Sequence, residues 1–303
     1  MRVISIFIMI IIFSPMLKPK NKDEKLNVQS VEIFKDTPVW DLTIALENHK
    51  FELATELISK SNLDLVNFLD PYFGTTLLMR AISTENYDAV ELLLKNGAKP
   101  NIISKGGETA LFRAIFYSWY DNDFNQDPKY VKIMLKFGAD PNLLYCAPKE
   151  EGVIDPIECG TSPLIQAVSN GIEKVKLLVE AGADINYKTK TGKTAAIKAL
   201  TRIKVEIAAY LIVENKAKVS DPYFYYNFPE RSEVDYKKPF FPINSLEKWF
   251  FELDSKEHRM KMDIVEEFKR QGQDYWSIEK HPKTIERIKK IYPNSWQEYL
   301  DRY

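Results

Sequence analysis

The hydrophobic pattern in the middle of the chain repeats. A hexamer that begins with Thr or Ser, continues with mostly apolar residues and ends in Ala occurs four times. The copies begin at Thr76, Thr109, Ser162 and Thr194. Each of the first three copies is followed by an apolar cluster and then a turn with Gly, as Leu92–Leu94 and Gly97 follow the first copy. A degraded version of this cluster and turn follows the fourth copy. Each copy therefore predicts a first helix capped by its Thr or Ser and a second helix with one buried apolar face.

The spacing of these copies defines a period. Their last residues are Ala81, Ala114, Ala167 and Ala199, which lie 33, 53 and 32 positions apart. A weaker copy ends at Ala45, 36 positions before Ala81. The turns after the apolar clusters end in Asn101, Asn142 and Asn186. The period is therefore about 33 residues with insertions, which indicates an array of helix pairs.

This combination resembles the ankyrin repeat, whose T-P-L-H-x-A core and G-A-x-x-N turn match these segments. The resemblance covers roughly residues 38–218 and about five repeats. It implies an all-α fold, an ankyrin-repeat helical solenoid, which we expect to carry a helical C-terminal cap. It also implies a non-catalytic scaffold that binds a partner protein on its concave face, formed by hairpin tips and first helices.

The residues before the array predict export. Arg2 precedes an apolar run, Val3–Phe13, which fits a secretory signal peptide. The run is shorter than the roughly 20 apolar residues of a spanning helix. We expect residues 1–17 to form a signal peptide and residues 18–36 a linker, and the mature protein to be periplasmic or secreted. The alternatives are an uncleaved N-terminal anchor, which would tether the protein to a membrane, and a buried helix.

Two insertions interrupt the array at residues 37–218. The insertion near residues 116–130 holds Trp119 and Tyr120, which either pack locally or form a contact patch. The insertion near residues 143–159 holds both cysteines of the chain, Cys146 and Cys159. In an exported chain, two cysteines in one loop predict a disulfide; in a cytosolic chain they would remain free thiols.

From residue 219 the repeat stops, and residues 219–303 form a C-terminal extension. Its first part, residues 222–243, is rich in proline and aromatic residues and is predicted to lie along the last repeat. Amphipathic helical patterns follow near Ser245–Asp254, Lys256–Gln271, Lys283–Ile291 and Ser295–Arg302. Terminal repeats need a cover for their apolar face, so we predict that this extension is that cover.

Composition narrows the chemistry. The chain has 42 Lys+Arg against 43 Asp+Glu, a formal net charge of −1, which argues against a nucleic-acid partner. Two Cys and three scattered His do not supply a zinc site. The stretch around Lys193 resembles the end of a phosphate-binding loop, but Tyr187 stands where the first Gly should be. We expect no catalytic residue, cofactor, metal or small-molecule substrate.

Two functions of other classes stay open. One is an enzyme with an unrecognised site in the C-terminal third, where His258 lies beside Glu257 and Asp263. The other is a structural protein that the N-terminal segment tethers to a membrane.

The predicted partner-binding residues lie at hairpin tips, in the inserted loops and on the first helices. Stacked repeats point equivalent residues in the same direction, so these residues should line one side of the array. The tip and loop candidates are Tyr72, Phe73, Lys105, Trp119, Tyr120, Tyr145 and Lys190. The first helices add Met79, Arg80, Phe112, Arg113 and Gln166, of which Met79 and Phe112 could instead be core. Tyr72, Phe73 and Tyr145 are the preferred anchors, because aromatic residues dominate many interfaces; the alternative is that they only cover the loop backbone.

Overall fold

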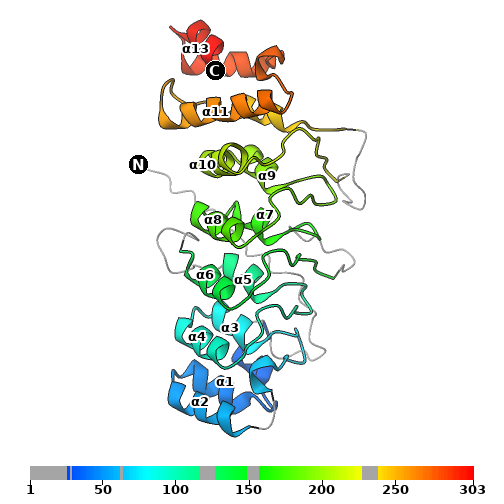
Figure 1. The fold of residues 1–303 in the computed structure, drawn as a ribbon, viewed down its shortest axis with the longest axis vertical. Coiled ribbons are helices and arrows are strands. Elements are labelled where there is room, and N and C mark those ends of the chain that lie inside the picture. The colour runs from blue at the N-terminus through cyan, green and yellow to red at the C-terminus, as the bar shows by residue number, and fades with distance from the viewer. Residues whose placement is uncertain (1–25, 28, 62–63, 117–126, 149–156, 227–237) are drawn as a thin grey trace. The chain divides into compact units, whose positions relative to one another are not determined.

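The computed structural model describes residues 26–27, 29–61, 64–116, 127–148, 157–226 and 238–303 (Figure 1). The predicted signal segment, Trp119 and Tyr120 lie outside these residues. The described residues form helices and turns, with two isolated β-bridges, Leu69–Thr76 and Tyr223–Phe240, and no strand. They divide into two compact units, one of residues up to 113 with 145–159, the other of 114–144 with 160–303. The division falls within one helix, α5 (Ala110–Phe116).

The first unit contains two complete helix pairs. Helix α1 packs against α2, α3 packs against α4, and α2 also contacts α4. Short 3-10 turns precede each pair. The elements are η1 (Val31–Phe34), α1 (Trp40–Glu47), α2 (Phe51–Lys60), η2 (Leu65–Asn67), α3 (Leu77–Ser83), α4 (Tyr87–Lys95) and the first part of α5.

The second unit continues the helix pairs and adds the C-terminal extension. Helix α7 packs against α8 and α9, and α9 packs against α10. The repeat helices are α6 (Lys129–Lys136), α7 (Pro163–Ala167), α8 (Ile172–Glu180), α9 (Ala195–Thr201) and α10 (Val205–Ala209), which continues into a π-helical turn, η3 (Tyr210–Glu214). The extension comprises η4 (Pro242–Lys248), α11 (Lys256–Arg270), η5 (Tyr275–Ser277), α12 (Pro282–Ile291) and α13 (Trp296–Arg302).

The first residue of each hexamer caps the helix that follows it. The side-chain oxygen of Thr76 accepts a hydrogen bond from the backbone N–H of Met79, three residues later, at 3.1 Å. Thr109, Ser162 and Thr194 accept the equivalent bonds at 3.1 to 3.2 Å. Each cap satisfies a backbone donor that the first helical turn leaves free. The predicted capping is therefore confirmed in all four copies.

Asparagine side chains connect consecutive turns within each unit. In the second unit, Asn142 accepts a hydrogen bond from the N–H of Asp184 at 2.8 Å and donates to the carbonyl of Gly182 at 3.1 Å. In the first unit, Asn67 makes the same pair of bonds with Lys99 and Gly97, at 2.8 and 3.1 Å. The sequence pattern does not predict this role for Asn67, because no hexamer or glycine turn marks its position.

The C-terminal extension covers the last helix pair of the second unit. Helix α11 packs against α10 and η3, and η4 packs against α9. At the end of α11, the Gln271 side chain accepts from the N–H of Val219 and donates to the carbonyl of Ala217, both at 3.0 Å. The fold is therefore an all-α array of helix pairs with a helical C-terminal cap, as the sequence predicted.

One helix expected in the extension is wrong. The pattern at Ser245–Asp254 predicts a helix. In the structure the 3-10 helix η4 ends at Lys248, and Trp249 adopts an extended backbone conformation. The Trp249 side chain is completely buried, and its indole N–H donates to the carbonyl of Leu200 in α9 at 3.0 Å. Burying this large side chain and pairing its N–H favours the extended backbone over another helical turn.

A buried lysine lies at the centre of the extension. The Lys261 ammonium lies 3.4 Å from the centre of the Tyr303 ring and 5.3 Å from that of Tyr275, and it donates to the carbonyl of Trp249 at 3.2 Å. The pKa of Lys261 is lowered to about 6, chiefly by burial and also by the positive charge of Lys280, whereas Glu247 opposes the shift. The aromatic rings and one carbonyl thus replace water around this side chain.

This environment makes stability depend on pH. The folded pKa of Lys261 is about 6 and its ordinary value is 10.5, so between these values the unfolded chain binds a proton that the folded chain does not. Wild-type stability should therefore gain up to about 1.4 kcal/mol per pH unit from this group as pH rises through that window. We predict that the stability difference between Lys261→Met and wild type is largest near pH 6 and shrinks toward pH 10. Urea unfolding at several pH values measures it.

Lys204→Met, at an exposed position, is the matched control and should show no such trend. A difference for Lys261→Met that stays constant across the window would contradict the prediction.

Candidate partner-binding surface

The first described hairpin tip is shaped by a buried aspartate. Asp70 is buried, and its carboxylate accepts hydrogen bonds from the N–H groups of Tyr72 at 2.9 Å and Phe73 at 2.7 Å, and also from Thr75. Burial raises the pKa of Asp70 above its usual range, although the three N–H donors oppose that shift. The carboxylate holds residues 71–75 in a tight turn, so Tyr72 is presented on a backbone with little freedom.

Two of the three preferred aromatic anchors are packing residues. Tyr145 is 3% exposed, and its ring stacks on that of Phe112 with centres 4.8 Å apart. Phe73 is also buried, whereas Tyr72 is 43% exposed. The prediction of Phe73 and Tyr145 as contact residues is therefore corrected, because their own unit covers them. Tyr72 keeps an accessible ring.

The predicted lysines lie on the surface. Lys105 is exposed; its N–H donates to the carbonyl of Phe73 at 2.9 Å, and its ammonium donates to the carbonyl of Pro71 at 2.7 Å. The structure thus brings Lys105 together with Tyr72 and the first tip. Lys190 is exposed on a tip of the second unit.

The proposed inner-face residues of the first helices are buried in the repeats. Arg80 pairs with Glu47 at 2.7 Å, and Arg113 pairs with Glu108 and donates to the hydroxyl of Ser83 at 3.2 Å. Met79, Phe112 and Gln166 are buried as well. These five residues therefore belong to the packing between helices and do not form an open contact surface. Their neighbours in space, such as Glu47 for Arg80, could not be assigned from the hexamer alone.

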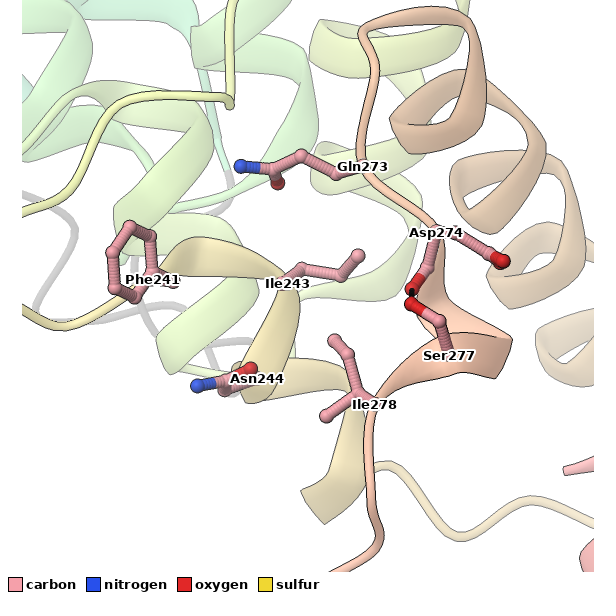
Figure 2. A pocket seen from close by; sticks show the side chains of 7 residues that line it. All are labelled: Phe241, Ile243, Asn244, Gln273, Asp274, Ser277 and Ile278. Atoms are coloured by element: carbon pink, nitrogen blue, oxygen red, sulfur yellow. Dashed lines mark hydrogen bonds between the residues drawn. The ribbon is translucent and has the colours of Figure 1, made fainter.

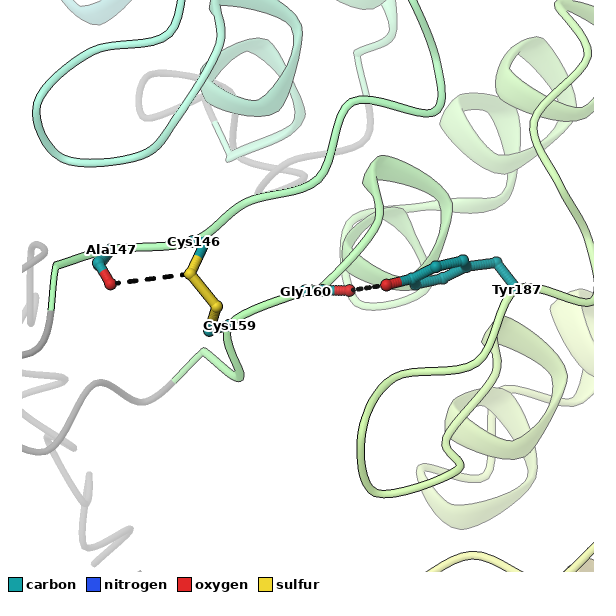
Figure 3. Close-up of a disulfide and its surroundings, with 5 residues drawn as sticks. All are labelled: Cys146, Ala147, Cys159, Gly160 and Tyr187. Atoms are coloured by element: carbon teal, nitrogen blue, oxygen red, sulfur yellow. Dashed lines mark hydrogen bonds between the residues drawn. A yellow bond between two sulfur atoms is a disulfide. The ribbon is translucent and has the colours of Figure 1, made fainter. Parts of the chain in front are cut away.

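The inserted loop is fastened at both ends. Cys146 and Cys159 form a disulfide, as predicted (Figure 3). The N–H of Cys146 donates to the carbonyl of Gly107 at 3.2 Å, which ties the loop to the preceding hairpin tip. On the other side of Cys159, the carbonyl of Gly160 accepts a hydrogen bond from the Tyr187 hydroxyl at 2.8 Å (Figure 3). The disulfide and the bond to Gly107 thus restrain the start of the loop within the first unit.

A small pocket lies in the C-terminal extension (Figure 2). Its volume is about 300 Å³, and it is lined by Phe241, Ile243, Asn244, Gln273, Asp274, Ser277 and Ile278. The Asp274 side chain accepts the N–H of Trp276 at 3.0 Å, and the Gln273 amide donates to the carbonyl of Ser220 at 2.9 Å. The Ser277 hydroxyl donates to the backbone carbonyl of Asp274 at 2.8 Å, so these polar groups take part in turns of the extension.

The histidine considered for catalysis has a structural role. His258 is buried; its Nδ1 accepts from the N–H of Asp254 at 3.3 Å, and its Nε2 lies 2.9 Å from the carbonyl oxygen of Arg302. Both ring nitrogens are thus bonded to backbone groups. The described residues also contain no cluster of three or more potential metal ligands, and none of their helices is long and apolar enough to cross a membrane.

Stacked pairs of short helices with capped first helices and glycine turns define a helical-repeat protein. A family model described as ankyrin repeats matches residues 42–145 and 123–222, and the chain belongs to the ankyrin repeat family. Ankyrin repeats indicate a protein–protein interaction scaffold, which implies protein partners, and the family is generally non-enzymatic.

Several curated proteins are similar over part of their length. "Putative ankyrin repeat protein FPV014" of Fowlpox virus (strain NVSL) is 29% identical over 43% of this chain and 33% of its own. The nuclear factor NF-kappa-B p105 subunit of Gallus gallus is 27% identical over 52% of this chain and 14% of its own. Glycerophosphocholine phosphodiesterase gde1 of Schizosaccharomyces pombe is 27% identical over 58% of this chain and 14% of its own. The chain thus spans a third or less of these relatives.

The close approach at Gly107 yields a stability prediction. Gly107 has a φ of +77°, and a Cβ there would lie 1.9 Å from the carbonyl oxygen of Cys146. Gly107→Ala should therefore strain the backbone and displace the disulfide loop, at a cost of more than about 2 kcal/mol. Gly97→Ala is a matched control, because its φ is +89° but a Cβ would meet nothing within 4 Å. It should cost only about 1 kcal/mol.

Urea unfolding of the two variants and the wild type measures both costs. Equal losses for the two variants would show that the contact with Cys146 does not restrict this position.

Proposed function

We propose that this protein is an exported, non-catalytic scaffold that holds a partner protein at the hairpin tips of its repeats. The exposed Tyr72 ring, on a tip held by the Asp70 carboxylate, is the observation that carries the proposal. A side chain on a rigid backbone loses little conformational freedom on binding, and tyrosine is among the residues that contribute most to interfaces. Lys105, packed beside the same tip, extends this contact.

Export is supported by two features. Arg2 and the apolar run Val3–Phe13 fit a signal peptide, and the Cys146–Cys159 disulfide fits an oxidising compartment. Membrane attachment through an uncleaved N-terminal segment is the alternative.

Export predicts the location of a reporter and the state of the thiols. Residues 1–30 fused to a reporter enzyme should direct it out of the cytoplasm, because the apolar run is recognised by the export machinery. Replacing Ile10 and Ile11 with Asp should retain it. The full chain isolated from the exported fraction should show no free thiol until it is reduced. A reporter that stays in the cytosol with the intact segment would refute export, and free thiols in fresh material would rule out the disulfide.

Partner binding is tested with the full chain. The protein is used as bait for the exported fraction, captured proteins are identified by mass spectrometry, and the affinity of the purified partner is measured. Tyr72→Ala should weaken binding by more than about 1 kcal/mol and leave the melting temperature nearly unchanged, because the side chain is exposed.

Leu53→Ala is the control, since Leu53 is 42% exposed on the second helix of its pair and outside the proposed face. If Tyr72→Ala binds like the wild type, or if both variants weaken binding equally, the tip is not the contact surface.

A further inference from the structure

The fifth residue of the hexamer is a cation in three of the four copies, but only two of these cations have an acidic partner in the structure. Arg80 and Arg113 are buried and pair with Glu47 and Glu108. Lys198 occupies the equivalent position on α9, and in the described part of the chain it forms no ion pair. A cation that packing has partly removed from water, with no anion beside it, is unfavourable for the isolated protein.

Further cations surround Lys198. Arg202 follows it by four residues, the spacing that places two side chains on the same side of a helix end. Arg202 is exposed and, among the described residues, also forms no ion pair. The pKa of Lys198 is lowered to about 8, chiefly by burial and also by the positive charges of Arg202 and Lys193. These three side chains therefore form a positive cluster at the inner helix of the last repeat.

Exposed aromatic rings adjoin this cluster. The Lys193 ammonium lies 4.5 Å from the centre of the Tyr225 ring, and the Tyr225 ring meets that of Phe240 edge-on with centres 4.9 Å apart. Both rings are more than 40% exposed. Backbone hydrogen bonds fix their segment, from Phe224 to the carbonyl of Thr191 at 2.8 Å and between Tyr223 and Phe240 at 2.8 and 2.9 Å. The rings therefore form a positioned apolar surface next to the positive charges.

We propose that Lys193, Lys198, Arg202, Tyr225 and Phe240, hereafter the Lys198 site, bind an acidic segment of the partner protein. The carboxylates of that segment would pair with Lys198 as glutamates of this chain pair with Arg80 and Arg113. An apolar side chain next to them would cover Tyr225 and Phe240. The inference rests on the proposed scaffold function and adds the chemistry of the partner.

Charge and composition favour an acidic protein segment over a nucleic acid. The site offers three cations beside two aromatic rings, whereas nucleic-acid binding uses an extended basic surface that follows the phosphates. The whole chain carries a formal net charge of −1, which gives no long-range attraction for a polyanion.

The test uses the full chain and a fluorescein-labelled peptide, Glu-Asp-Phe-Glu-Glu-Leu-Asp, with fluorescence anisotropy as the readout. The acidic peptide should bind, and its affinity should fall as salt is added, because salt screens the attraction. Arg202→Glu and Lys198→Gln should each weaken binding about tenfold. Arg202 is exposed, so its variant should fold like the wild type even if Lys198→Gln is less stable. Lys132→Glu makes the same change of charge at an exposed position on α6 and should have little effect.

Three results would overturn the inference. One is equal binding of a control peptide with Lys in place of every acidic residue. Another is unchanged affinity for the acidic peptide in Arg202→Glu and Lys198→Gln. The third is displacement of the acidic peptide by oligouridylate at a lower concentration than by unlabelled peptide, which would indicate a nucleic-acid site. If a partner is captured through the Tyr72 tip but its affinity is insensitive to Arg202→Glu, the scaffold function stands and the Lys198 site alone fails.

Discussion

None of the repeat helices that the structure describes is long enough to be stable alone. The described repeat helices contain between five and ten residues, whereas isolated helices shorter than about 12 to 15 residues are marginal in water. Stability must therefore come from stacking one pair against the next. This requirement explains the small residues Ala81, Ala114, Ala167 and Ala199, all buried, where a larger side chain would separate neighbouring helices. It also explains why side-chain bonds such as those of Asn142 and Asn67 reach into the following turn.

Stacking leaves one apolar face uncovered at the end of any array, and the C-terminal extension covers it in the second unit by different chemistry. The repeats bury mostly aliphatic residues and alanine, whereas the extension buries Trp249, Tyr275 and Tyr303 around Lys261. The hydroxyl of Tyr299 donates to the carbonyl of Phe251 at 2.7 Å, and that of Tyr303 donates to the carbonyl of Leu246 at 3.5 Å. The first of these bonds satisfies a carbonyl in a segment that is not helical, so the irregular stretch after η4 can be buried.

Features that depend on one repeat could be predicted from the sequence. The caps, the glycine turns and the Cys146–Cys159 disulfide each involve residues in one short stretch, and the structure confirms them. Exposure could not be predicted in the same way, because it depends on neighbours in other repeats. Tyr145 is covered by Phe112, 33 positions earlier, and Arg80 is paired with Glu47, also 33 positions earlier. The period that identifies the fold thus also determines which candidate side chains the neighbouring repeat covers.

The fifth hexamer position differs between repeats in whether its charge is paired within the array. A cation there next to a glutamate of the same array is satisfied internally and serves stacking, as with Arg80 and Arg113. At the same position without a glutamate, the side chain still leaves the helix in the same direction, because the cap and the buried alanine fix the helix. Its charge then has no acidic partner within the array. Lys198 is in this second situation, with Arg202 beside it. The presence or absence of one acidic neighbour therefore distinguishes the paired arginines from Lys198, although the same kind of capped helix presents all three.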